Sequence, residues 1–178
     1  ALLKHAIDVA EELIQDSSTL QPLLVQAPHT PAPLHGQIAR SVQIIAGARH
    51  PVMLAGNGVI RGHAHEAVRQ FAPQLGIPVL HTFMAKGVLP DSDPLSLYTI
   101  GLQARDYTAV VMEQADVVVA VGYDFVEYAP CFWNPRRDKH IVHVDGLPAE
   151  VDEHYIVDVG ELGDLRLSLP LIQKELSS

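Results

Sequence analysis

Five consecutive aliphatic residues, Val-Val-Val-Ala-Val at 117–121, constrain the fold of this chain more than any other segment. An unbroken aliphatic run bounded by turn residues is typical of a strand buried on both faces, as in parallel sheets covered by helices. The run ends at a glycine, and the next six residues carry two carboxylates and two tyrosines. Because open α/β sheets bind ligands just outside the carboxyl ends of their strands, the segment predicts both a fold and the position of a candidate site.

The rest of the sequence alternates between strand and helix patterns. Short apolar runs bounded by turn residues favour strands, and apolar residues at three- and four-residue spacing favour helices. Strands are expected at 51–55, 78–81, 117–121, 140–144 and 155–159, helices at 38–48, 64–75, 106–114 and 162–176, and a long loop at 82–105. Strands that alternate with helices need right-handed crossovers. We therefore predict an α/β fold with a doubly wound, Rossmann-like parallel sheet of five to six strands.

The first 36 residues are expected to lie apart from this alternating region. Residues 3–14 have the apolar spacing of a helix, and residues 22–26 favour a strand. The three prolines that follow remove backbone donors and clash with the residues before them, which excludes a helix interior or a central strand. We divide the chain into a helix-strand segment (1–27), a proline-rich linker (28–36) and a central domain (37–178).

Composition excludes several classes of protein. The net charge is −9 and the basic residues do not cluster, so nucleic-acid binding is not expected. No apolar run approaches the roughly 20 residues that cross a bilayer, and the start of the sequence lacks the basic-then-apolar order of a signal peptide. Cys131 is the single cysteine, which excludes an internal disulfide. We expect a cytoplasmic protein that does not bind membranes.

Several motifs occur in the same order as in a known family. They are Tyr-Asp-x-x-Glu-Tyr-x-Pro-x-Phe-Trp-Asn at 123–134 and shorter matches at 86–90, 100–102, 142–149 and 163–164. From about residue 50 to about residue 165, the chain resembles the central domain of the catabolic acetolactate synthases, which are thiamine-diphosphate enzymes. The resemblance implies a homo-oligomeric parent that binds thiamine diphosphate and Mg²⁺ in flanking domains and condenses two pyruvates to 2-acetolactate with loss of CO₂. It also implies that residues 1–27 close the preceding domain.

Glycines follow the first strand of the central domain at positions 56, 58 and 62. Glycines at this place let the diphosphate of a dinucleotide approach the backbone, but here the third comes one residue too late. His-Thr at 81–82 also stands where a ribose-binding carboxylate would follow the second strand, so a tight turn with positive φ is the alternative. The candidates for a vestigial nucleotide site are Gly56, Asn57, Gly58, Gly122 and Asp145. For Asp145 the alternative is a structural turn residue.

The loop after the central strand departs from the pattern of the FAD-binding relatives. Those proteins carry arginines where this chain has Asp124 and Tyr128, and a second aspartate where it has Leu147. We therefore predict that FAD is not bound. From the residues alone, Asp124 and Glu127 either form an acid–base pair or a metal site, or they cap helices or pair with the arginines at 136–137.

No catalytic or metal-binding residue is expected in this chain. His63 and His65 are two residues apart and do not share a helix face, and Gly-Asp-Leu at 163–165 is not the family's Gly-Asp-Gly signature for Mg²⁺. Because the cofactor carries the chemistry, the isolated chain is expected to be inert. By resemblance, four residues border the substrate channel of the parent: Gly101, Leu102, Glu127 and Tyr128.

Three functions are consistent with these features. The first is the central domain of an acetolactate synthase. The second is the central FAD-binding domain of a pyruvate oxidase or another 2-oxo acid decarboxylase, and flavin absorbance would distinguish it. The third is a stand-alone nucleotide-binding module with a regulatory role, which titration with ADP, NAD or FAD would reveal.

Overall fold

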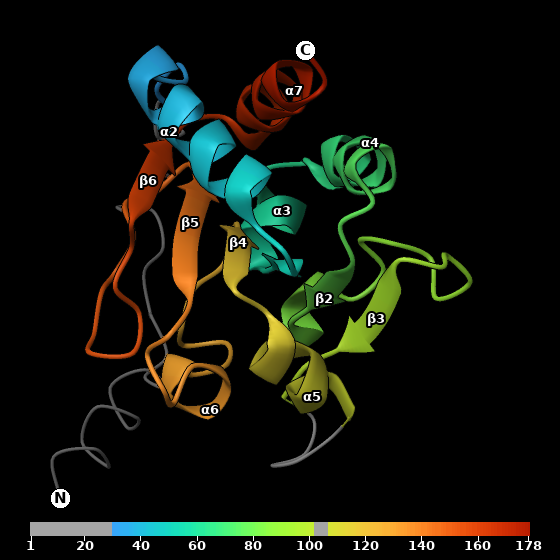
Figure 1. Cartoon of the computed structure of the whole chain (residues 1–178). Helices are drawn as coiled ribbons and strands as arrows, with labels where there is room; N and C mark the ends of the chain where they lie inside the picture. Colours follow the sequence, from blue (N-terminus) through green and yellow to red (C-terminus); the bar gives the residue numbers. More distant parts are fainter. Residues whose placement is uncertain (1–29, 102–106) are drawn as a thin grey trace, which may run out of the picture.

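The computed structural model describes residues 30–101 and 107–178, which form a six-stranded sheet between two layers of helices (Figure 1). The strands are β1 (Pro51–Ala55), β2 (Val79–His81), β3 (Ser96–Thr99), β4 (Val117–Val121), β5 (His140–Asp145) and β6 (Val159–Leu162). All neighbours are parallel, in the order β3-β2-β1-β4-β5-β6. The chain thus starts near the centre at β1, moves outward to β3 and crosses to β4 on the other side. The predicted doubly wound parallel sheet is confirmed.

β4 lies between β1 and β5, and all five of its residues are buried. Its register with β1 runs without a break from Pro51 opposite Val117 to Ala55 opposite Val121. A strand with neighbours on both sides and helices on both faces reaches no water, so an unbroken aliphatic run fits this position. The strand order reverses between β1 and β4, and in doubly wound folds this reversal creates the crevice that binds ligands.

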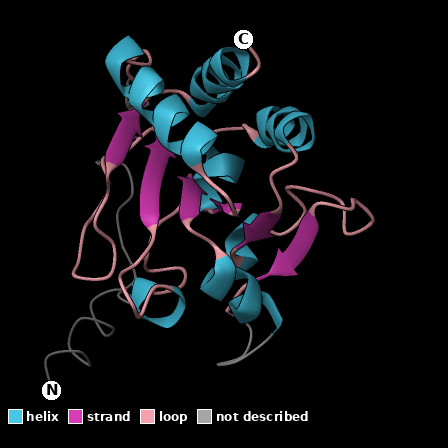
Figure 2. Cartoon of the chain, in the orientation of Figure 1, coloured by secondary structure: helices cyan, strands magenta, loops and turns pink. Residues whose placement is uncertain are grey.

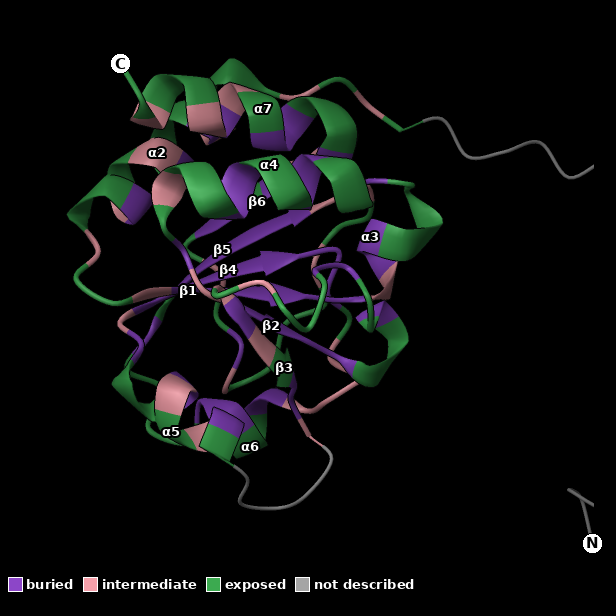
Figure 3. Ribbon diagram, turned by 90° about the vertical axis from the view of Figure 1, so that its right-hand side faces the viewer, coloured by how far each residue is buried: buried purple, intermediate pink, exposed green. Residues whose placement is uncertain are grey.

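Three long helices cover one face of the sheet, and two short helices cover the other (Figures 2 and 3). The long ones are α2 (His35–Gly47), α4 (His65–Leu75) and α7 (Leu165–Leu176), with α7 packed on both α2 and α4. The short ones are α5 (Tyr107–Gln114) and α6 (Pro130–Trp133). None of the helices in the described ranges is long and apolar enough to cross a membrane.

Two further short helices follow strands at the carboxyl edge of the sheet. They are α3 (Asn57–Arg61), directly after β1, and the 3-10 helix η1 (Phe83–Ala85), directly after β2. The sequence predicts only a turn for the first of them. At this edge, therefore, α3 supplies the helix that a Rossmann domain places next to its ligand.

Local sequence signals set two of the helix ends. α4 ends as predicted before Gly76, which adopts a left-handed φ of 64° as the C-cap. α7 begins directly after Asp164, because this side chain accepts a hydrogen bond from the Arg166 amide at 2.9 Å. The start predicted for this helix, at residue 162, is therefore wrong by three residues.

The strand predicted at 155–159 is wrong. The last strand, β6, begins only at Val159, and Tyr155 forms an isolated antiparallel bridge with Asp152. Tyr155 is 1% exposed because its ring packs against Trp133 and His143 in the core between the sheet and the short helices. The loop segment at 155–158 and the strand at 159–162 are both short and partly apolar. The hydrophobic pattern therefore does not distinguish a strand from a buried loop here.

β3 lies inside the region predicted to be a loop. It is a four-residue edge strand, Ser-Leu-Tyr-Thr, and it pairs only with β2. Residues 30–34 have no regular secondary structure, and α2 begins at His35, within the range assigned to the linker. The helix and strand predicted within residues 1–27 lie outside the described residues.

Candidate functional site

Three glycines close the crevice between β1 and β4. The Gly56 amide donates to the Val121 carbonyl at 2.9 Å, and the Gly58 amide donates to the Gly122 carbonyl at 2.7 Å. A Cβ added to Gly56 would lie 2.5 Å from the Gly122 oxygen, and one added to Gly58 would lie 2.6 Å from the Gly122 Cα. Gly122 has a φ of 58°, which glycine adopts without steric cost. The two loops are therefore in backbone contact, with no room for a side chain.

Glu127 reaches into this crevice from the loop after β4. Its carboxylate accepts hydrogen bonds from the Asn57 amide at 3.0 and 3.2 Å, from the Thr82 hydroxyl at 2.5 Å and from the Asp124 amide at 3.3 Å. Asn57 is the first residue of α3, so the carboxylate satisfies an amide that the helix itself leaves unpaired. Of the roles left open for Glu127, the structure shows helix capping.

The alternative in which this loop pairs with the two arginines is wrong. Arg136 pairs with Asp138 at 2.7 Å, and Arg137 pairs with Glu153 at 2.6 Å. The Asp124 carboxylate instead accepts the Val126 amide at 3.0 Å within its own loop. Neither loop carboxylate pairs with these arginines: Asp124 holds its own loop, and Glu127 holds the first amide of α3 and the Thr82 hydroxyl.

This crevice does not fit the diphosphate of a dinucleotide. In Rossmann domains the diphosphate lies at the N-terminus of the first helix, where free amides point toward it. Here the Asn57 amide already donates to Glu127, and the Gly58 amide donates to Gly122. A bound diphosphate would also lie close to the Glu127 carboxylate, and like charges repel. The structure brings Gly56, Asn57, Gly58 and Gly122 together and uses them for contacts within the chain.

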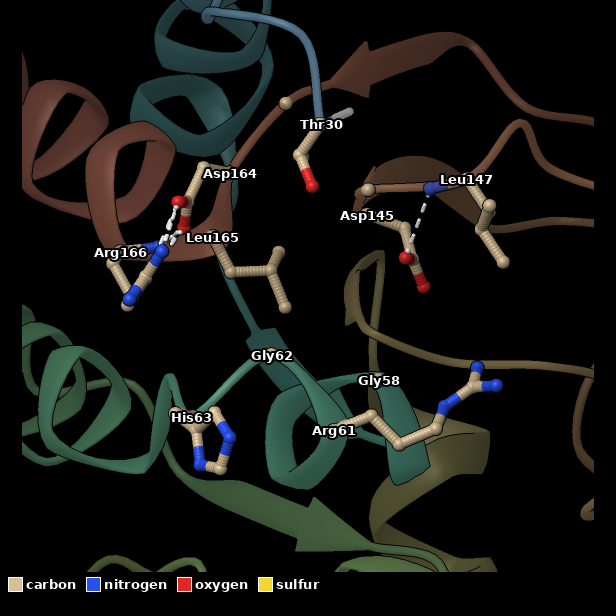
Figure 4. A pocket seen from close by; sticks show the side chains of 12 residues that line it. Thr30, Gly58, Arg61, Gly62, His63, Asp145, Leu147, Asp164, Leu165 and Arg166 are labelled. Carbon is tan, nitrogen blue, oxygen red and sulfur yellow. Dashed lines mark hydrogen bonds and ion pairs between the residues drawn. The ribbon is translucent and has the colours of Figure 1, made fainter. Parts of the chain in front are cut away.

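A cavity of about 330 Å³ opens beside this contact, between α3, the end of β5 and the start of α7 (Figure 4). Asp145 lines the cavity from the end of β5, and Arg61 lines it from α3. On the side of α7, Asp164 and Arg166 form an ion pair of 2.6 Å. The Asp145 carboxylate accepts the Leu147 amide at 3.1 Å, as expected of a turn residue. Burial raises the pKa of Asp145. A carboxylate and a guanidinium across one cavity suit a small polar ligand with hydroxyl and anionic groups.

The structure describes three of the four channel candidates, and Leu102 lies outside the described residues. Gly101 follows β3 with a φ of 86°, and a Cβ there would lie 2.5 Å from the Tyr128 ring. The Tyr128 ring stacks on Phe132, with centroids 5.6 Å apart and planes inclined by 22°. Gly101, Glu127 and Tyr128 therefore gather at the carboxyl edge of the sheet.

Three residues after β2 belong to the same edge, although no sequence motif marks them. Thr82 is fully buried and donates to Glu127, and the next two side chains, Phe83 and Met84, are 54% and 47% exposed. Phe83, Met84 and Val126 line a cavity of about 240 Å³ together with Glu127. These residues can be recognised as part of the site only by their position directly after β2, the strand next to β1. The edge thus combines a fixed carboxylate with exposed apolar side chains.

A buried polar network supports the loop after β4. The Trp133 indole donates to the Tyr123 hydroxyl at 3.1 Å, and that hydroxyl donates to the Tyr128 carbonyl at 2.5 Å. The His143 Nδ1 lies 2.8 Å from the Tyr155 hydroxyl. Burial lowers the pKa of His143 to about 4 and raises the pKa of Tyr123, so both groups are neutral near pH 7. These side chains hold the loop in place.

The histidines of the described ranges form no metal centre. His140 and His143 lie on opposite faces of β5, one exposed and the other buried, as the strand period predicts. Across residues 30–101 and 107–178, no group of three or more His, Cys, Asp or Glu side chains is arranged to hold a metal ion.

Fold and site together define a Rossmann-like domain whose ligand crevice is occupied by its own backbone and by Glu127. The sequence profile of the thiamine pyrophosphate enzyme central domain matches residues 38–172. The chain therefore belongs to the thiamine pyrophosphate enzyme family, as its central domain, and the resemblance seen in the motifs is confirmed.

Curated relatives give a more specific similarity. The chain is 32% identical over 176 residues to an acetolactate synthase of Bacillus subtilis, an alignment that covers 98% of this chain and 30% of that protein. It is 31% identical over 173 residues to an acetolactate synthase of Mycobacterium avium, an alignment that covers 90% of this chain and 27% of that protein. It is also 31% identical over 141 residues to a probable acetolactate synthase large subunit of Methanococcus aeolicus, and this alignment covers 79% of this chain and 24% of that protein. The chain thus spans less than a third of the length of these relatives.

Proposed function

We propose that the chain is the central domain of an acetolactate synthase, whose parent enzyme condenses two pyruvates to 2-acetolactate with loss of CO₂. The observation that carries this proposal is the alignment of 98% of the chain with an acetolactate synthase at 32% identity. The parts of the parent that flank this chain would bind thiamine diphosphate and Mg²⁺. The cofactor supplies the carbon–carbon chemistry when it is bound there, so the isolated chain would be inert.

The crevice supports a flavin-free version of this domain. The first two amides of α3 already donate to Glu127 and Gly122, so they are engaged in the absence of any nucleotide. Asp124 and Tyr128 offer no positive charge where the flavin-binding pattern has arginines. We therefore propose that the parent works without FAD, in the manner of the catabolic enzymes rather than of pyruvate oxidase.

We assign the carboxyl edge of the sheet to the border of the substrate channel in the parent. Its exposed apolar side chains and its fixed carboxylate suit a wall that excludes water and positions pyruvate, which changes rate without proton transfer. The residues assigned to this wall are Gly101, Leu102, Glu127 and Tyr128.

The activity is tested with the parent enzyme and the 178-residue chain side by side. The parent should form acetolactate from pyruvate only with thiamine diphosphate and Mg²⁺, and it should show no flavin absorbance. The isolated chain should form none. Release of acetate or acetaldehyde without acetolactate, or a stoichiometric flavin spectrum, would contradict the proposal. We also propose a cytoplasmic homo-oligomer, which light scattering of the parent would test.

The channel wall is tested by substitution in the parent. Leu102→Ala and Glu127→Ala should lower kcat/KM for pyruvate and leave the affinity for thiamine diphosphate nearly unchanged, measured where both variants remain folded. Asp124→Ala is the matched control, because this exposed carboxylate accepts the Val126 amide within its own loop and does not accept the Asn57 or Thr82 donors that Glu127 holds. Full activity in both variants, or loss of the cofactor, would show that the wall is assigned wrongly.

A further inference from the structure

The two faces of the sheet are covered unequally (Figure 3). One face carries helices of 13, 11 and 12 residues, α2, α4 and α7. The other carries α5 with eight residues and α6 with four. A parallel sheet needs helices or another apolar layer on both faces, because its strands are apolar on both sides. The second face is thinly covered within the described part of the chain.

Large apolar side chains are exposed on this thin side. Tyr98 is 44% exposed, Tyr107 65%, Val110 52% and Phe132 64%. They are connected rather than scattered: Tyr98 meets Tyr107 edge-on with centroids 6.3 Å apart, and α5 packs against α6, which carries Phe132. Contiguous apolar surface of this kind marks an interaction site more often than single exposed residues do.

The sequence of α5 does not match a helix that faces water. Its first six residues, Tyr-Thr-Ala-Val-Val-Met at 107–112, include no charged side chain. A surface helix normally shows a polar stripe opposite its apolar one, and a helix that is apolar on all sides is usually buried. Thr108 and Met112 already face the core, so Tyr107 and Val110, 65% and 52% exposed, form a second apolar side that no element of residues 30–101 or 107–178 buries.

We propose that the thin face, formed by Tyr98, Tyr107, Val110 and Phe132, is the surface that docks against a flanking domain of the same parent polypeptide. The proposal rests on the proposed function, in which the chain is one domain of a larger enzyme. The aligned Bacillus subtilis protein extends well beyond this chain, which makes up 30% of it, so a flanking domain is available as the occupant. A second copy of this chain is the competing occupant, and the mass of the isolated chain distinguishes it from a flanking domain.

The single cysteine reports on this face without any substitution. Cys131 is exposed on α6, next to Phe132. In the 178-residue chain, its thiol should react with a maleimide at the rate of a free surface cysteine. In the parent, docking should slow this reaction at least tenfold, measured on the Cys131 peptide by mass spectrometry. Ala46→Cys, at an exposed position on α2, is the control and should react alike in both proteins.

Amide hydrogen exchange of residues 107–114 gives a second readout. These amides should exchange more slowly in the parent than in the isolated chain. Equal thiol and amide rates in both proteins would overturn the proposal. Protection of Cys131 in the isolated chain together with a dimeric mass would also overturn it, in favour of a second copy. An active parent with an unprotected face refutes only the docking surface, whereas a protected face on a parent without acetolactate activity refutes only the proposed function.

Discussion

Glu127→Ala is the substitution that most directly tests the account of the closed crevice. The Glu127 carboxylate joins three segments that are distant in the sequence: the first turn of α3, the end of β2 and its own loop after β4. Its removal takes the acceptor from the Asn57 amide and from the fully buried Thr82 hydroxyl. No other single side chain of this edge accepts hydrogen bonds from all three segments within the described ranges.

The expected cost follows from these partners. Loss of a helix cap costs about 0.5–2 kcal/mol, and a buried donor left unpaired costs about 1–3 kcal/mol. The Thr82 hydroxyl can rotate and Asn57 is only half-buried, so we expect a total of about 2–3 kcal/mol in the free energy of unfolding. For a domain of this size, each kcal/mol shifts Tm by about 2–4 °C, which gives a decrease of about 4–12 °C.

The assay is thermal and urea unfolding of the 178-residue chain, followed by circular dichroism. Asp124→Ala is the control, since within the described residues this exposed carboxylate accepts the Val126 amide alone, and we expect it to cost about 0.5 kcal/mol. In a double-mutant cycle, Glu127→Ala and Thr82→Val should couple by about 1 kcal/mol, because they remove the same hydrogen bond. A Tm for Glu127→Ala within 2 °C of the wild type would refute the idea that Glu127 closes the crevice.

Three further predictions concern stability. Burial lowers the pKa of folded His143 from 6.5 to about 4, so the unfolded chain binds a proton that the folded chain excludes. Stability should therefore fall as pH decreases from about 6.5 toward 4, and His143→Gln should flatten this part of a urea-midpoint profile. Gly122→Ala should lower the free energy of unfolding by about 3 kcal/mol or more, since the added Cβ would lie 2.4 Å from the Val59 amide nitrogen. Gly47→Ala is the control: the added Cβ has open space around it, so the same urea titration should show no change. A chain that starts at Gln37 should keep most of its calorimetric stability, and complete loss of cooperative unfolding would show that the preceding residues belong to the core.

The fold could be predicted where side-chain chemistry alone decides the local structure. Residues 117–121 are aliphatic without interruption, and the only strand position that suits such a run is one buried on both faces. Gly76 likewise fixes the end of α4 through its left-handed φ. β3 could not be predicted, because Ser-Leu-Tyr-Thr at 96–99 is short and half-polar and becomes a strand only by pairing with β2.

The candidate site was predictable in its position but not in its contacts. The carboxyl ends of parallel strands share one edge, so the candidates Gly56, Asn57, Gly58 and Gly122, each just after a strand, were placed at that edge. The amide that donates to the Glu127 carboxylate is determined by the strand order, because Asn57 lies 70 residues away in the chain. The same holds for Thr82, which reaches Glu127 only because β2 lies beside β1. Long-range hydrogen bonds of this kind require the tertiary structure.

The strand order also determines when this domain can fold during synthesis. β1 leaves the ribosome well before its neighbour β4, which is complete only after Val121, and α7 covers α2 and α4 only once Leu176 has emerged. At 5–20 residues per second, the apolar sides of β1, α2 and α4 remain uncovered for a time on the order of 10 s. Translation products that stop before Leu165 should therefore aggregate or bind chaperones rather than accumulate as folded half-domains.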